Sequence, residues 1–256
     1  MLLVFDIGNT NTVMGIYEGE TLTHHWRLTS KKQTADEFGI IILGMLASVG
    51  ITKDDVEGAI FGSVVPPLDE LLRESVRRYI GVECLRVSTK LDTGLKIKMK
   101  NATGLGADRL LDAVAGVAKY GAPLIVVDLG TAITFDVISP DGSYIGGAIA
   151  PGMEIAMESL FSRTAKLPQI ELRAPKNYIG GNTVQAIQSW IIFGTVGMID
   201  KMIKGIFKEL GCTCRVVATG GHSSLVAKYS NRIDLVDPWM TLDGLRILYE
   251  RNRLAK

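Results

Sequence analysis

The sequence has few cysteines, no long apolar run and no excess of charge, and each absence argues against a class of protein. Only three cysteines occur in 256 residues, an odd count that does not suit a disulfide framework, so a cytoplasmic protein is expected. The apolar runs are shorter than the roughly 18 residues of a membrane-spanning helix. With 28 basic and 27 acidic side chains, the chain offers no general field for nucleic acid or an anionic membrane.

Metal-binding side chains are also sparse. Cys212 and Cys214 form a Cys-x-Cys pair without further ligands nearby, and His24 and His25 are adjacent, so on a strand they point to opposite faces. We interpret both pairs as ordinary surface or half-buried residues. The chain also lacks the G-x-x-x-x-G-K-[ST] loop, which argues against a P-loop fold.

The hydrophobic pattern predicts an α/β protein large enough for one large or two ordinary domains. Apolar strands alternate with helices of regular apolar spacing. A capping box, Thr34-Ala-Asp-Glu37, opens the first predicted helix. Strands are expected at 2–5, 12–17, 21–28, 57–64, 93–100, 123–127, 135–139, 144–150 and 215–218, and helices at 34–50, 68–80, 105–120, 152–161, 183–210 and 241–251.

Two segments repeat an unusual pattern of acid, glycine and threonine. DIGNTNT begins at Asp6 and DLGTAIT begins at Asp128, and Asp, Gly and the final Thr occupy matching places. Each segment follows an apolar strand and precedes a strand, a glycine turn and another strand. The repeat predicts two related halves, which we divide into domains 1–117 and 118–256.

A turn of this kind suits phosphate binding. Glycine lets the backbone approach a ligand, and free N–H groups with Thr or Asn side chains donate to phosphate oxygens. The carboxylate repels phosphate but acts through a cation that attracts both. A single copy is as consistent with a plain Asp-Gly hairpin turn. Two copies favour the phosphate interpretation, with both turns facing one nucleotide across a cleft.

Three further motifs complete a resemblance: GADR at 106–109, GGNT at 180–183 and ATGGH at 218–222. Together with the two turns, they make the sequence similar to type III pantothenate kinase, a branch of the acetate and sugar kinase/Hsp70/actin superfamily. The resemblance covers nearly the whole chain. It implies two duplicated ribonuclease-H-like (actin-like ATPase) domains with an interdomain cleft. It also implies ATP-dependent phosphorylation of pantothenate to 4′-phosphopantothenate, the first step of coenzyme A biosynthesis, by a homodimer.

The resemblance also implies site residues. Asp108 is expected to be the catalytic base, Asp6 to act on Mg²⁺, and Asp128 to bind a monovalent cation, K⁺ or NH₄⁺. Thr183 is expected to reach pantothenate across the dimer interface. The residues implied for ATP are Asp6, Ile7, Gly8, Asn9, Thr10, Asn11, Thr12, Val13, Thr131, Gly220 and Gly221, and those implied for pantothenate are Gly106, Ala107, Asp108, Arg109 and Thr183.

Simpler interpretations of these motifs remain open on chemistry alone. Asp108 could merely favour the helix dipole. Asn182 or Thr183 could serve as a helix N-cap, and the glycines at 220 and 221 could form a strand-to-helix turn. The sequence also departs from the family pattern at two places: Met99 stands where many relatives carry tyrosine, and Trp190 where relatives usually carry glycine.

Other functions remain open beside the kinase. The same scaffold could act on another small molecule as a kinase or phosphatase. It could also serve as a non-catalytic transcriptional regulator, although retention of Asp6, Asp108 and Asp128 argues against this. A nucleotide-dependent clamp like Hsp70 would need a peptide-binding domain, for which the chain is short.

Overall fold

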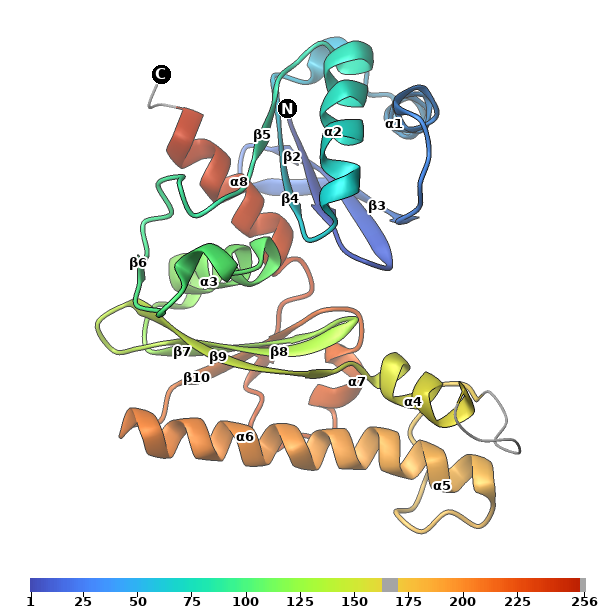
Figure 1. Cartoon of the computed structure of the whole chain (residues 1–256), viewed down its shortest axis with the longest axis vertical. Coiled ribbons are helices and arrows are strands. Elements are labelled where there is room, and N and C mark those ends of the chain that lie inside the picture. The colour runs from blue at the N-terminus through green and yellow to red at the C-terminus, as the bar shows by residue number, and fades with distance from the viewer. Residues whose placement is uncertain (163–169, 254–256) are drawn as a thin grey trace. The chain divides into compact units, whose positions relative to one another are not determined.

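The computed structural model describes residues 1–162 and 170–253, which form two compact units (Figure 1). The first unit comprises residues 1–95, 100–115 and the segment that begins at Met240. The second unit comprises Lys96–Met99 and Gly116–Trp239. The C-terminal helix thus belongs to the first unit, whereas the sequence placed it in the second domain.

The first unit is built on a five-stranded sheet with the order β3-β2-β1-β4-β5. Strands β1, β2 and β3 form an antiparallel meander, and β4 and β5 continue the sheet parallel to β1. The strands are β1 (Leu2–Ile7), β2 (Asn11–Glu18), β3 (Thr21–Thr29), β4 (Gly58–Ser63) and β5 (Cys84–Arg86).

The second unit repeats this plan in a six-stranded sheet with the order β11-β10-β7-β8-β9-β6. Strands β7, β8 and β9 form the meander, and β10 and β11 run parallel to β7. The α/β fold of two related halves is therefore confirmed. The strands are β6 (Lys96–Ile97), β7 (Leu124–Leu129), β8 (Ala132–Ile138), β9 (Ser143–Pro151), β10 (Arg215–Thr219) and β11 (Leu235–Val236).

Helices cover both sheets. In the first unit, α1 and α2 enclose the face that carries Leu3, Phe5 and Ile7. In the second unit, α6 runs along the face that carries Ile125 and Val127 (Figure 1). The helices are α1 (Ala35–Ser48), α2 (Pro66–Ser75), α3 (Ala107–Tyr120), α4 (Met153–Ser162), α5 (Thr183–Ser189), α6 (Thr195–Leu210), α7 (Ser223–Ala227) and α8 (Met240–Arg253).

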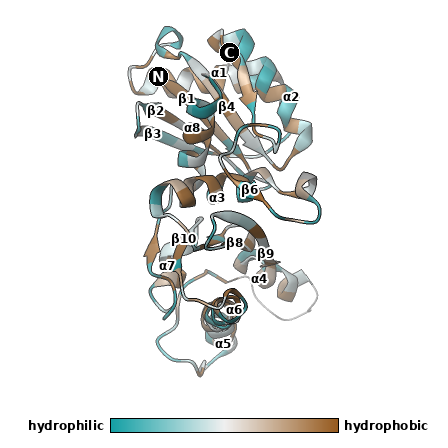
Figure 2. Cartoon of the chain, turned by 90° about the vertical axis from the view of Figure 1, so that its left-hand side faces the viewer, coloured by the Kyte–Doolittle hydropathy of each residue, from teal (hydrophilic) through white to brown (hydrophobic). Residues whose placement is uncertain are grey.

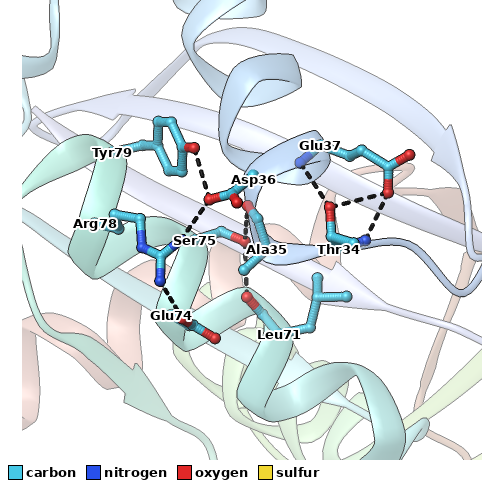
Figure 3. Close-up of polar contacts among 9 residues, drawn as sticks. All are labelled: Thr34, Ala35, Asp36, Glu37, Leu71, Glu74, Ser75, Arg78 and Tyr79. Atoms are coloured by element: carbon cyan, nitrogen blue, oxygen red, sulfur yellow. Dashed lines mark hydrogen bonds and ion pairs between the residues drawn. The ribbon is translucent and has the colours of Figure 1, made fainter.

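The predicted capping box fixes the start of α1 (Figure 3). The backbone N–H of Thr34 donates to the Glu37 carboxylate at 2.7 Å, and the Glu37 N–H donates to the Thr34 hydroxyl at 3.2 Å. Asp36, the second residue of α1, accepts hydrogen bonds from the Tyr79 hydroxyl at 2.7 Å and from Arg78 at 2.5 Å. The hydrogen bond from Tyr79, followed by that from Arg78, lowers the pKa of Asp36. These contacts tie α1 to the π-helical turn Val76–Ile80, which follows α2.

Several local elements differ from the sequence prediction. The strand expected at 93–100 is reduced to the two residues of β6. The helix expected at 183–210 consists of α5 and α6 joined by a π-helical turn, Trp190–Gly194.

The helix α3 is largely apolar, as Figure 2 shows. Within the described residues, no helix has the length and apolar character that spanning a bilayer requires.

Candidate functional site

Asp6 lies where three elements of the first unit meet. It is the penultimate residue of β1 and lies directly opposite Gly62 of β4. A Cβ at Gly62 would lie 2.6 Å from Leu111 and 3.6 Å from the Ala107 Cβ, both on α3. Glycine at position 62 therefore lets the first turn of α3 approach the sheet beside Asp6.

A second glycine holds α3 from its other side. A Cβ at Gly244 of α8 would lie 2.3 Å from the carbonyl oxygen of Leu111, so only glycine permits this contact. The hydroxyl of Thr241 on α8 donates to the buried carboxylate of Asp112 at 2.7 Å. The hydroxyl of Tyr17 on β2 donates to Asp243 of α8 at 2.6 Å. The position of α3 is thus fixed by both the sheet and α8.

The GADR motif opens α3, as predicted. Gly106 precedes the helix, and its carbonyl accepts the Leu110 N–H at 3.1 Å. The Asp108 carboxylate accepts the backbone N–H of Arg109 at 2.8 Å. A Cβ at Gly106 would lie 2.4 Å from the same carboxylate oxygen. Glycine at 106 therefore gives the Asp108 carboxylate room.

The two carboxylates influence each other. Burial, and then the negative charge of Asp108, raise the pKa of Asp6 to about 7, while the positive charge of Arg27 acts in the opposite direction. Part of the Asp6 surface still reaches solvent. Two carboxylates that repel each other favour a proton or a cation nearby.

The first glycine turn is held by a serine that the sequence did not reveal. The Ser30 hydroxyl donates to the Gly8 carbonyl at 2.7 Å and lies 2.9 Å from the Thr12 hydroxyl. The Ser30 N–H donates to the Thr10 carbonyl, and the Gly8 N–H to the Asn11 carbonyl, each at 3.0 Å. Ser30 lies far along the chain from the turn, and no local pattern marks it.

The residues predicted for ATP differ in exposure along this turn. The side chains of Asn9 and Thr10 are exposed, whereas Ile7 and Thr12 are buried. Val13 lies on β2, directly opposite Asp6. Asn9 and Thr10 are therefore the side chains best exposed to a ligand, and Thr12 shapes the turn through Ser30.

The second turn brings together the predicted residues of the second unit. Asp128 is the penultimate residue of β7, and its carboxylate lies against Gly220, where a Cβ would be 2.2 Å away. Gly220 also has φ +87°, which favours glycine. Thr131 is exposed, and its carbonyl accepts the Gly152 N–H at 3.1 Å. Gly221 is also exposed.

The GGNT motif opens α5. Asn182 is the N-cap, and its side chain accepts the Gln185 N–H at 2.9 Å. Thr183 is the first helical residue and is exposed. Capping by Asn182 is one of the two alternatives that the sequence allowed, and it leaves the Thr183 side chain at the surface.

The donor set decides which cations suit the two turns. Among residues 1–162 and 170–253, no group of three or more His, Cys, Asp or Glu side chains could hold a metal ion. Water and substrate would therefore supply the other oxygen ligands of a cation at Asp6 or Asp128. Mg²⁺ binds in this way, through one or two carboxylates with water and phosphate oxygens.

Comparisons with known proteins agree on one family. The family model for type III pantothenate kinase matches residues 2–205. The type III pantothenate kinase of Geobacillus sp. (strain WCH70) is 46% identical over 253 residues, which cover 98% of each chain. That of Brevibacillus brevis is 46% identical over 254 residues, which cover 99% of this chain and 100% of the relative.

Solved structures show the same fold at low identity. A Baf family protein from Campylobacter jejuni matches with a TM-score of 0.63 and 20% identity, covering 98% of this chain and 99% of its own. Component A of (R)-2-hydroxyglutaryl-CoA dehydratase from Acidaminococcus fermentans matches with a TM-score of 0.55 and 12% identity, covering 100% and 99%. At these identities the likeness concerns the fold alone.

Replacement of Asp6 by asparagine should stabilise the protein in a pH-dependent way. The folded state holds the Asp6 proton up to about pH 7, whereas the ordinary pKa of an aspartate is 3.8. The folded state therefore binds more protons in this window, so the Asp6 contribution to the free energy of unfolding falls as pH rises through it. Thermal melts without metal should show that Asp6→Asn raises Tm more at about pH 8 than at about pH 5. Asp54→Asn, at an exposed position of the same unit, is the control, and an equal gain at both pH values would contradict the expectation.

Proposed function

This chain belongs to the type III pantothenate kinase family, and from that premise we propose which residues transfer a phosphoryl group from ATP to pantothenate in coenzyme A biosynthesis. The observation that carries the proposal is the pair Asp6 and Asp108 on one face of the first sheet, with GADR at the start of α3. The family assignment does not favour the regulatory alternative.

Asp108 acts as the base for the primary hydroxyl of pantothenate. As the oxygen attacks the γ-phosphorus of ATP, a new P–O bond forms, the bond to ADP breaks, and the hydroxyl proton passes to Asp108. The N-terminus of α3 favours negative charge at this place. Arg109 and the backbone of Gly106 and Ala107 orient the substrate.

The two glycine turns bind the nucleotide. In the first turn, the exposed side chains of Asn9 and Thr10 and the backbone of Gly8 donate to phosphate oxygens, and Asp6 holds Mg²⁺. Burial, and then the charge of Asp108, raise the pKa of Asp6, and a divalent cation would offset both effects. Bound Mg²⁺ neutralises charge on the phosphates.

The second turn contributes Thr131 for phosphate, Asp128 for a monovalent cation, and Gly220 with Gly221 for adenine. Neither glycine turn carries a lysine or arginine between residues 6–13 or 128–134. A monovalent cation at Asp128 would therefore balance triphosphate charge.

A direct assay tests the assignment. The purified protein is incubated with ATP, Mg²⁺, K⁺ and pantothenate, and the product is identified by mass spectrometry. We expect 4′-phosphopantothenate and ADP in equal amounts. A folded protein that forms no phosphopantothenate but phosphorylates another small alcohol would contradict the substrate assignment.

Asp108→Asn should lower kcat at least about 10²-fold, because removal of a general base typically has this effect. The KM for ATP should change little, since the change removes a proton acceptor and leaves the glycine turns intact. Initial rates at saturating substrates measure this. Asp36→Asn, which alters a carboxylate at the start of α1, serves as the control, and wild-type turnover in Asp108→Asn would exclude the base role.

Replacement of K⁺ by Na⁺ should lower activity if Asp128 binds the monovalent cation. In Asp128→Asn the rate should fall and the response to K⁺ should disappear, because the charge that attracts the cation is lost. A titration of rate against K⁺ at constant ionic strength measures both effects. A wild-type enzyme that is indifferent to K⁺ would remove the cation from the mechanism.

Homodimer formation through the region of α5 is the third part of the proposal. Large apolar side chains near Thr183 are exposed: Ile179 is 89% exposed, Tyr178 74% and Trp190 61%. Apolar groups gathered near one helix favour burial against a partner. A second copy there would bring Thr183 to the pantothenate of its neighbour. It would also place Trp190, where relatives usually carry glycine, in the contact.

Trp190→Glu should therefore convert a dimer into a monomer and raise the KM for pantothenate, because a charge at the contact costs desolvation and the Thr183 contact is lost. Light scattering after size-exclusion chromatography gives the mass. Ile40→Glu, at a 63% exposed isoleucine of the first unit, is the matched control. If Trp190→Glu stays dimeric while Ile40→Glu dissociates, the contact lies elsewhere.

A further inference from the structure

Arg27 of β3 lies on the same face of the first sheet as Asp6. Val13 of β2 is directly opposite Asp6 on one side and directly opposite Arg27 on the other. Residues in direct register across a sheet project from the same face, so the three side chains form a row. Two strand spacings, about 10 Å, separate the backbones of Asp6 and Arg27. Across this distance, the positive charge of Arg27 acts on Asp6.

Arg27 has no structural partner that would explain its position. Within residues 1–162 and 170–253, no ion pair or side-chain hydrogen bond involves it, and it is exposed. By contrast, Arg78 and Arg86 of the same unit form ion pairs with Asp36 and Asp69. The fold therefore gains nothing evident from the guanidinium of Arg27.

Negative charge gathers on this face during the proposed reaction. Asp6 and Asp108 are both negative when ionised, and the transferred phosphoryl group adds further charge. Neither glycine turn supplies a lysine or arginine. Lys31, the next cation along the chain after Arg27, acts on Glu37. Arg27 is thus the cation of β3 placed to balance the charge beside Asp6.

We propose that Arg27 binds the non-bridging oxygens of the phosphoryl group while it passes from ATP to pantothenate. The guanidinium is a planar fork that matches two phosphate oxygens. It donates N–H groups to these oxygens and is unchanged by the reaction, in which the bond to ADP breaks, the bond to pantothenate forms and the proton goes to Asp108. The inference rests on the proposed role of Asp108 and adds a phosphate-binding residue to it.

Arg27→Ala should lower kcat about 10²-fold, as loss of one donor to a developing charge typically does, with the KM for pantothenate nearly unchanged. Arg27→Lys keeps the charge without the fork and should be intermediate. Arg77→Ala is the matched control, because Arg77 is also exposed but lies in the turn Val76–Ile80, which packs on the opposite face. Circular dichroism confirms that each variant is folded. Arg27 lies on β3, an edge strand that pairs with β2.

Binding by calorimetry separates the phosphoryl group from the pantothenate carboxylate. If Arg27 holds the phosphoryl group, Arg27→Ala should weaken phosphopantothenate at least about tenfold and leave pantothenate unchanged. Free guanidinium should restore part of the rate in Arg27→Ala but not in Asp108→Asn. Equal weakening of both ligands would assign Arg27 to the carboxylate, and wild-type kcat in Arg27→Ala would overturn the inference. If Asp108→Asn also keeps full activity, the proposed base fails as well, so the two failures are distinct.

Discussion

The close approach of α3 to the first sheet is the constraint on which the proposed chemistry depends. Side chains at Gly62 and Gly244 would collide with Leu111, so glycine at both places allows the helix to begin beside Asp6. The approach brings the Asp108 carboxylate near Asp6 and raises the pKa of Asp6. Burial opposes charge on Asp6, so the protein retains an unfavourable carboxylate at the position where the proposed mechanism places a cation ligand.

The duplication supplies the same structural element twice, with different neighbours. In each half, the carboxylate is the penultimate residue of the first meander strand and is followed by a glycine turn. In the first unit the neighbouring helix adds a second carboxylate, whereas in the second unit Gly220 lies against Asp128. The two halves therefore surround the same carboxylate with different neighbours, which is why the proposal assigns different cations to them.

Much of the fold follows from local sequence. The apolar strands, the capping box at Thr34 and the repeat at Asp6 and Asp128 are short-range patterns, so the two meanders and the α/β class were predictable. The short strands β5 and β11 were not, because two or three residues carry too little pattern. The placement of α8 on the first unit depends on contacts between distant residues, such as Gly244 with Leu111.

The site was predictable in its motifs and not in its supports. Each acid-glycine turn and GADR is a contiguous stretch of sequence, whereas Ser30 and Arg27 come near these motifs only through the pairing of distant strands.

The most direct measurement of the central claim is the pKa of the Asp6 carboxyl, followed by carbon NMR in metal-free protein. We predict titration at about pH 7 in the wild type and a lower value in Asp108→Asn. Titration of Asp6 near the ordinary range for aspartate, unchanged by Asp108→Asn, would contradict the placement of α3 beside it.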